Sequence, residues 1–217
     1  MRIKKYILGK IFLTFLIINT SNCEKLADSF FSEKDDVKMG LSFDKEIRSN
    51  SGKYTVLQDK ILLNYVQKIV NTLKKSPKIK RKSVYPYKVT ILDDDKVINA
   101  FCTPGGFIYV YTGLMKFLEN EASLAAVLAH EIAHAEKRHA RQRMLSRIGI
   151  NILLSLLLGS NDNPWIELGM KLGGGLAVLH NSRGDEKEAD EEAFKYLENS
   201  PYYRGGMSYF FDKVSDG

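Results

Sequence analysis

The feature that most constrains this chain is the pentapeptide His130-Glu131-Ile132-Ala133-His134, which reads H-E-x-x-H. It lies in a stretch from residue 120 to 146 that contains no Pro or Gly and is dominated by Ala, Leu, Glu, Lys and Arg. This composition predicts one continuous helix. Apolar residues recur at helical spacing and predict that the helix is buried; they are Leu124, Val127, Leu128 and Ala135.

The two histidines are four residues apart and therefore lie on one face of the predicted helix. Both imidazoles can then reach one zinc ion, with Glu131 beside them to accept the proton of a metal-bound water. The pattern predicts a zinc hydrolase with one ion per chain, because unligated core histidines would leave polar groups unpaired. A third histidine, His139, is about 140° further round than His134, so we expect it to face away from the metal, beside the site or at the surface.

A zinc ion held by two histidines needs at least one further protein ligand. Residues 181–190 predict the start of a second helix, with Ser182 and Asp185 as a capping box. Glu186 and Asp190 share one face of it, so Glu186 could complete a His-His-Glu site while Asp190 holds the outer nitrogen of a ligating histidine. An exposed acidic helix without a metal explains the charge pattern equally well.

The remaining elements follow from local periodicity. Residues 58–75 repeat apolar side chains at helical spacing and predict a packing helix. Residues 87–92 alternate and predict a strand, and two further short strands are predicted within residues 99–111, on either side of a turn at Pro104-Gly105-Gly106. The strongly apolar residues 148–158 are too few to span a bilayer and predict a core helix or a lid above the site.

The amino terminus predicts export. Residues 1–22 combine a basic start with a short apolar run, which is the layout of a secretory signal. Cys23 follows directly and resembles the lipid acceptor of a bacterial lipoprotein, with plain secretion and an uncleaved anchor as alternatives. We predict a linker over residues 23–36 and one domain over residues 37–217, because the chain is too short for two domains of ordinary size.

The charge does not indicate nucleic-acid binding. The formal charge of +6 includes four basic residues within residues 1–22, which contain no acid, so +2 remains for the rest of the chain. A near-neutral domain lacks the basic surface that binding to DNA or RNA requires. We therefore expect no nucleic-acid partner.

Three segments in register resemble the gluzincin peptidases of the HtpX/BepA-like type, whose wider clan includes the CAAX prenyl endopeptidases. The segments are residues 99–106, residues 124–134, and the Ser182-Arg183 pair with Glu186 and Asp190. Their order and spacing match over roughly residues 37–212, and three linked motifs are far more specific than H-E-x-x-H alone. The resemblance implies an α+β fold, a mainly helical zincin-type metalloprotease domain with a small β-sheet edging the active-site helix.

The resemblance also implies roles for the site residues and makes the chain a zinc metalloendopeptidase. His130, His134 and Glu186 would be the zinc ligands, Glu131 the catalytic base, and Asp190 a support for one of the ligands. An edge strand would pair with extended or unfolded polypeptide substrates by β-augmentation. Its residues are Asn99, Ala100, Phe101, Cys102 and Thr103.

Secreted and lipidated members of this family act in protein quality control in the cell envelope. The signal, with no spanning segment after it, implies the soluble branch that faces the periplasm, attached to a membrane by a lipid or a signal anchor. A hydrolase of a non-peptide bond and a chaperone-like envelope lipoprotein with a latent metal site are the alternatives. Cys102 replaces a small inert residue of the family; a buried side chain, a disulfide with Cys23 and a thiol near the metal all remain open.

Overall fold

The computed structural model describes residues 31–148, 182–206 and 208. The chain divides into two compact units, residues 1–32 and 33–217, and the fold below is that of the second unit. The predicted signal, the lipidation site Cys23, most of the predicted linker and residues 149–158 of the apolar run lie outside the described residues.

Secondary structure follows the local signals of the sequence. The helix expected over residues 58–75 is observed as α4, capped by the Asp59 side chain, and the three expected strands are β1, β2 and β3. No helix among the described residues combines the length and the apolar character needed to cross a bilayer. In chain order the elements are α3 (Glu33–Ser49), α4 (Lys60–Leu73), η2 (Arg81–Ser83), β1 (Lys88–Leu92), β2 (Ala100–Thr103), β3 (Phe107–Tyr111), α5 (Thr112–Phe117), α6 (Glu121–Lys137), α7 (His139–Ile148) and α10 (Arg183–Glu198).

The strands form a three-stranded sheet in the order β1-β3-β2. β1 pairs with β3 in parallel, whereas β2 pairs with β3 antiparallel, with Ala100 opposite Val110. The tight connection between β2 and β3 places Gly105 and Gly106 at φ values of 78° and 79°, a region that favours glycine. Within the described part of the chain no strand pairs with the outer side of β2, so the predicted substrate strand is an edge strand.

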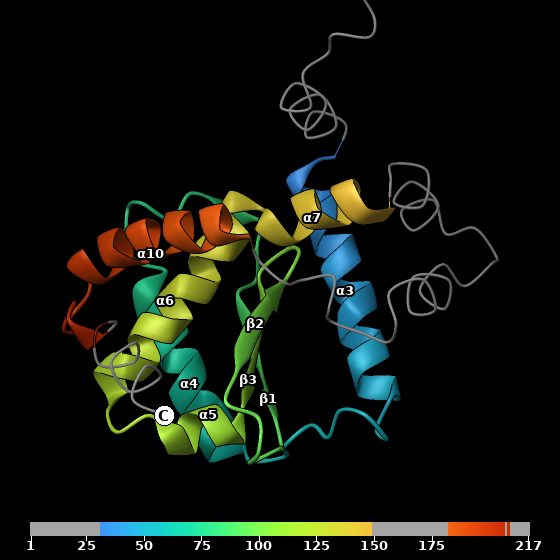
Figure 1. Cartoon of the computed structure of the whole chain (residues 1–217), viewed down its shortest axis with the longest axis horizontal. Helices are drawn as coiled ribbons and strands as arrows, with labels where there is room; N and C mark the ends of the chain where they lie inside the picture. The colour runs from blue at the N-terminus through green and yellow to red at the C-terminus, as the bar shows by residue number, and fades with distance from the viewer. Residues whose placement is uncertain (1–30, 149–181, 207, 209–217) are drawn as a thin grey trace, which may run out of the picture. The chain divides into compact units, whose positions relative to one another are not determined.

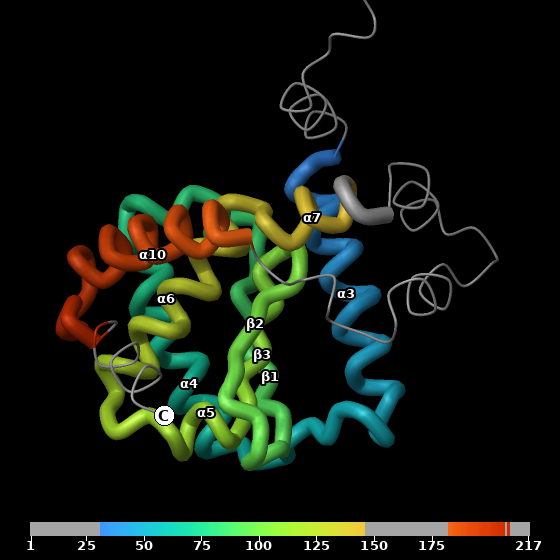
Figure 2. The backbone as a smooth tube through the Cα atoms, viewed as in Figure 1, coloured from blue at the N-terminus to red at the C-terminus, as the bar shows by residue number. Residues whose placement is uncertain are grey.

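The sheet lies between α3 on one side and α4 with α6 on the other (Figures 1 and 2). Successive side chains of a strand point to opposite faces, so each strand contributes to both cores. The face toward α4 and α6 includes Val89, Ile91, Cys102, Ile108 and Val110. The face toward α3 includes Leu92, Phe107 and Tyr109, which cluster with Ile47. This mainly helical domain with one small sheet confirms the predicted α+β fold.

The prediction of one continuous helix over residues 120–146 is wrong at a single residue. Arg138 has φ 62° and ψ 27°, a left-handed conformation that ends α6, and α7 begins at His139. Neither Gly nor Pro marks this break. The side chain of Arg138 explains it, because its Nε lies 2.7 Å from the Asp36 carboxylate of α3, which is 1% exposed. A tertiary ion pair therefore selects a backbone conformation that local propensity disfavours.

α3 begins earlier than the domain boundary drawn from the sequence. The helix starts at Glu33, so residues 33–36 of the predicted linker are helical. Asp36 belongs to this first turn and is buried, where it accepts hydrogen bonds from Arg138 and from the Tyr85 hydroxyl. These contacts anchor the start of α3 to the junction between α6 and α7.

Candidate metal centre

The H-E-x-x-H segment lies in the second half of α6. His130 and His134 are one turn apart on the same face, and their Nε2 atoms are 2.8 Å apart. The side chain of His134 is 2% exposed and that of His130 is 13% exposed, so the pair is accessible to solvent mainly at His130. Asn120 caps the start of the helix, where its side chain accepts a hydrogen bond from the Ser123 amide.

α10 packs against α6 and brings the downstream acidic residues to these histidines (Figure 1). Its amino end has the predicted capping box, in which Ser182 and Asp185 exchange side-chain-to-amide hydrogen bonds. Arg143 of α7 donates to the Asp185 carboxylate at 2.9 Å and ties α7 to the same end of α10. Ala189 and Ala193 are fully buried in the core that α6 also lines, and such small side chains allow two helices to approach closely.

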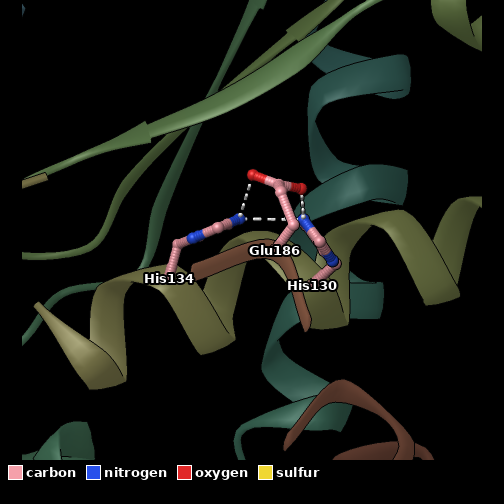
Figure 3. A group of neighbouring side chains, drawn as sticks. All are labelled: His130, His134 and Glu186. Atoms are coloured by element: carbon pink, nitrogen blue, oxygen red, sulfur yellow. Dashed lines mark hydrogen bonds and ion pairs between the residues drawn. The ribbon is translucent and has the colours of Figure 1, made fainter. Parts of the chain in front are cut away.

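Glu186 completes a group of three donors (Figure 3). One oxygen of its carboxylate lies 3.2 Å from Nε2 of His130, and the other lies 3.5 Å from Nε2 of His134. The donor atoms of the three residues all lie within 4.8 Å of one another. The structure thus brings together the three residues that were predicted to be zinc ligands.

The geometry of this group fits a metal ion. Two unprotonated Nε2 atoms at 2.8 Å would repel, so a proton or a cation must lie between them. Ligands of a tetrahedral zinc ion with bonds of about 2.0 Å are about 3.3 Å apart, and the donor distances of 2.8 to 3.5 Å bracket that value. Two imidazoles and a carboxylate are also a donor set that zinc prefers, so these residues could hold the ion.

The carboxylates around His130 favour a positive charge at this position. Burial disfavours a charged His130, but hydrogen bonds to Asp190 and Glu186 outweigh it and raise its pKa to about 10. Burial, with the charge of His130 beside it, lowers the pKa of His134 to about 2 and keeps this ring neutral. The cluster therefore holds one positive charge readily, as a cation site must.

Both histidines are hydrogen-bonded through the nitrogen that faces away from the cluster. Nδ1 of His130 lies 2.8 Å from the Asp190 carboxylate, so Asp190 reaches the outer nitrogen of a histidine as the sequence predicts. Nδ1 of His134 lies 2.8 Å from Nδ1 of His139, which is 1% exposed. His139 lies beside the site, one of the two positions that the sequence predicts for it, and the turn at Arg138 brings its ring to His134. No local signal identifies this contact in the sequence.

Glu131 directly follows His130 in α6 and is buried. The residue is 8% exposed, and burial raises the pKa of its carboxyl to about 7, with the charge of His130 opposing the rise. The backbone amide of Cys102 on β2 faces this carboxyl and lowers its pKa, against the effect of burial. A carboxyl with a pKa near neutrality can both accept and return a proton, and here it faces the edge strand.

The expected edge-strand segment is observed with a slightly later start. β2 begins at Ala100, although the carbonyl of Asn99 still accepts a hydrogen bond from the Tyr111 amide. Phe101 stacks on Tyr109 with a centroid distance of 4.8 Å on the face toward α3. Cys102 is a buried free cysteine on the face toward α6, and burial raises the pKa of its thiol. The last residue of the segment, Thr103, is also buried.

Comparison with curated proteins gives relatives of two kinds. The beta-barrel assembly-enhancing proteases of Yersinia pestis and Escherichia coli K12 are 28% and 27% identical over 202 and 200 residues, or 88% of this chain. The alignments cover 40% and 39% of those proteins, so the chain spans about two fifths of their length. The mitochondrial metalloendopeptidase OMA1 of Schizosaccharomyces pombe is 36% identical over 96 residues, 44% of this chain and 28% of that protein.

A family model covers the same region. The model of peptidase family M48 matches residues 61–211, which is more than half of the chain and includes the sheet, α6 and α10. The match therefore contains the two histidines, Glu131 and Glu186. With the donor geometry described above, these findings establish that the chain belongs to peptidase family M48.

Proposed function

We propose that this chain is a zinc-dependent endopeptidase that hydrolyses peptide bonds of unfolded or misassembled proteins. The observation that carries the proposal is the juxtaposition of the His130, His134 and Glu186 donors with the buried carboxyl of Glu131. Peptide hydrolysis needs a polarised carbonyl, an activated water and a group that moves a proton. A bound zinc ion supplies the Lewis acidity for the first two requirements.

The protein side chains carry the remaining steps. Glu131 removes a proton from the attacking water and later delivers it to the leaving amine, a transfer that suits a carboxyl with a pKa near 7. Asp190 fixes the ring of His130 through Nδ1 and so directs Nε2 toward the ion. Glu186 brings a negative charge to the site from α10, a different helix.

The edge strand is the proposed substrate platform. The carbonyl of Asn99 is bonded to β3, and because partners alternate along an antiparallel pair, Ala100 and Cys102 turn their backbone groups toward the open edge. The Cys102 amide faces Glu131, so the Cys102 carbonyl and both backbone groups of Ala100 are the groups proposed to bind a substrate. An extended polypeptide pairing there lies next to the catalytic carboxyl. Such main-chain recognition favours unfolded segments over a particular side-chain sequence.

The relatives and the amino-terminal sequence support a location in the cell envelope. Two of the similar proteins are named for the assembly of β-barrels, which are outer-membrane structures. Residues 1–22 have the layout of an export signal. We infer that the chain is exported and acts in envelope protein quality control, attached to a membrane face through a lipid on Cys23 or through its signal.

The test combines metal content with turnover of an unfolded protein by the wild type and by Glu131→Gln. We expect one zinc ion per chain in both, and a loss of hydrolysis of at least about a hundredfold in the variant, since a general base contributes about 10²- to 10⁴-fold. Stoichiometric zinc with undiminished turnover in Glu131→Gln would refute the role of this residue. Zinc without activity in either protein would favour the latent scaffold, and an absence of zinc would refute the metal site.

A further inference from the structure

The two histidines of the cluster are supported in different ways. Nδ1 of His130 contacts the Asp190 carboxylate directly at 2.8 Å. Nδ1 of His134 contacts another imidazole, that of His139, at 2.8 Å, and Nε2 of His139 lies 3.0 Å from the Glu188 carboxylate. α10 thus supplies a carboxylate to support each histidine. Asp190 contacts His130 directly, whereas the ring of His139 lies between Glu188 and His134.

The direction of the hydrogen bonds from His134 through His139 to Glu188 follows from the proposed metal site. A histidine that binds an ion through Nε2 carries its proton on Nδ1 when neutral. Nδ1–H of His134 therefore donates to Nδ1 of His139. His139 then carries its own proton on Nε2 and donates it to Glu188. When both rings are neutral, each has one donor and one acceptor, so this order of hydrogen bonds toward Glu188 requires that His134 has an unprotonated Nε2.

The position of His139 is constrained from several sides. It is 1% exposed and directly follows Arg138, whose left-handed turn brings α7 back against the end of α6. Glu188 is more open, with a side chain 48% exposed, but its second oxygen lies 3.0 Å from Nζ of Lys137. Because His139 is buried and Glu188 is held by its ion pair with Lys137, these two residues are preorganised to orient His134.

We propose that His139, oriented by Glu188, is a positioning residue that keeps His134 in the tautomer and rotamer required for metal binding. This inference rests on the zinc site of the proposed function. It assigns His139 no contact with substrate or ion. Residues that orient a ligating histidine through its outer nitrogen commonly change metal affinity by about 10- to 100-fold.

The test measures zinc affinity of the full chain by competition with a chromophoric chelator, after the metal has been removed. His139→Leu removes the acceptor at Nδ1 and fills the buried position with an apolar side chain. It should weaken zinc binding about 10- to 100-fold. His139→Asn places an amide oxygen close to the position of Nδ1 and should restore affinity to within about threefold of the wild type. The visible spectrum of the cobalt-substituted protein should shift in the leucine variant and return toward that of the wild type in the asparagine variant.

A second pair of variants addresses Glu188 without altering the buried ring. Glu188→Gln removes the charge that orients His139 and should weaken zinc binding several-fold. Glu192→Gln is the matched control, because Glu192 pairs with Lys137 at 3.0 Å and with Lys195 and not with His139, and it should leave the affinity unchanged. Urea unfolding of the metal-free proteins shows whether His139→Leu folds. If it does not, the Glu188 and Glu192 variants test the positioning role of His139 in its place.

The outcomes separate the inference from the proposed function. A wild type that binds no zinc would overturn the metal site itself. Tight zinc binding by the wild type, with equal affinity in His139→Leu or with equal effects of the Glu188 and Glu192 variants, would overturn only the positioning role. Failure of His139→Asn to restore affinity that His139→Leu loses would also contradict it, because the loss would then reflect packing and not the hydrogen bond.

Discussion

Replacing Arg138 by glycine and by alanine separates two contributions to stability at the junction of α6 and α7. One is the cost of the left-handed backbone of Arg138, and the other is the ion pair of its side chain with Asp36. The left-handed backbone of Arg138 costs a residue with a side chain about 1 kcal/mol, and glycine adopts it freely. The guanidinium opposes this cost through its 2.7 Å contact with Asp36, a carboxyl that is 1% exposed. Glycine removes both the strain and the ion pair, whereas alanine removes only the ion pair.

The structure sets the size of each effect. Losing one partner of a buried ion pair costs about 3 to 5 kcal/mol when the other charge is left alone. Asp36 is not left alone, because the Tyr85 hydroxyl donates to it and Nη1 of Arg141 lies 3.6 Å away. Burial also raises the pKa of Asp36, so the carboxyl can take up a proton when its partner is lost. We therefore expect a loss of about 3 kcal/mol for Arg138→Ala and about 2 kcal/mol for Arg138→Gly.

Urea unfolding of the metal-free proteins at neutral pH measures both values. The difference of about 1 kcal/mol between the two variants reports the backbone alone. An alanine variant as stable as the glycine variant would show that the left-handed conformation carries no cost. A glycine variant more stable than the wild type would show that the ion pair does not repay its burial, and the explanation of the helix break would then be wrong.

Three further predictions concern other parts of the domain. Burial opposes ionisation of Asp44, but a hydrogen bond from Arg48 outweighs this effect and holds the pKa of Asp44 below its ordinary value of 3.8. The ionised carboxylate therefore stabilises the fold above about pH 4, and this stabilisation is lost as the pH falls through the pKa that Asp44 has in the folded state. Asp44→Asn should therefore flatten the pH dependence of the urea midpoint between about pH 5 and pH 3, and an unchanged slope would refute this. Ala189→Leu should overpack the α6–α10 contact, cost about 1 to 3 kcal/mol and weaken zinc binding, whereas the exposed Glu191→Leu should do neither. Ala100→Pro removes an outward-facing amide of β2 and should raise KM for an unfolded protein about five- to tenfold with little change in kcat; a fall in kcat alone would contradict pairing at this edge.

The sequence predicts those parts of the domain that depend on short-range signals. The histidine spacing, the Pro-Gly-Gly turn and the capping box at Ser182 each involve residues within a few positions of one another, and the structure contains all three elements. Glu186 was harder to assign, since an acidic helix is compatible with solvent exposure. The family motif, and not the charge pattern, favours Glu186 as a proposed ligand over a surface carboxylate.

The break at Arg138 could not be predicted, because its cause lies about a hundred residues away in the sequence. Asp36 and Arg138 are 102 positions apart, and neither has an unusual local context. The contact of His139 with Nδ1 of His134 could not be predicted for the same reason, since extending α6 in a straight line does not bring the two rings together. Long-range ion pairs that override helix propensity are invisible to any argument from periodicity.

The docking of α10 would make a bound zinc ion a reversible cross-link between two helices. α6 provides two of the candidate donors, and α10 provides the third together with both supporting carboxylates. An ion bound only by the folded chain would stabilise this docking by about 4 kcal/mol at a free concentration a thousand times its dissociation constant. Chelation should therefore accelerate amide hydrogen exchange first in α10, before the β-sheet. When zinc is scarce, the domain would then keep its core folded while the proposed active site is disassembled.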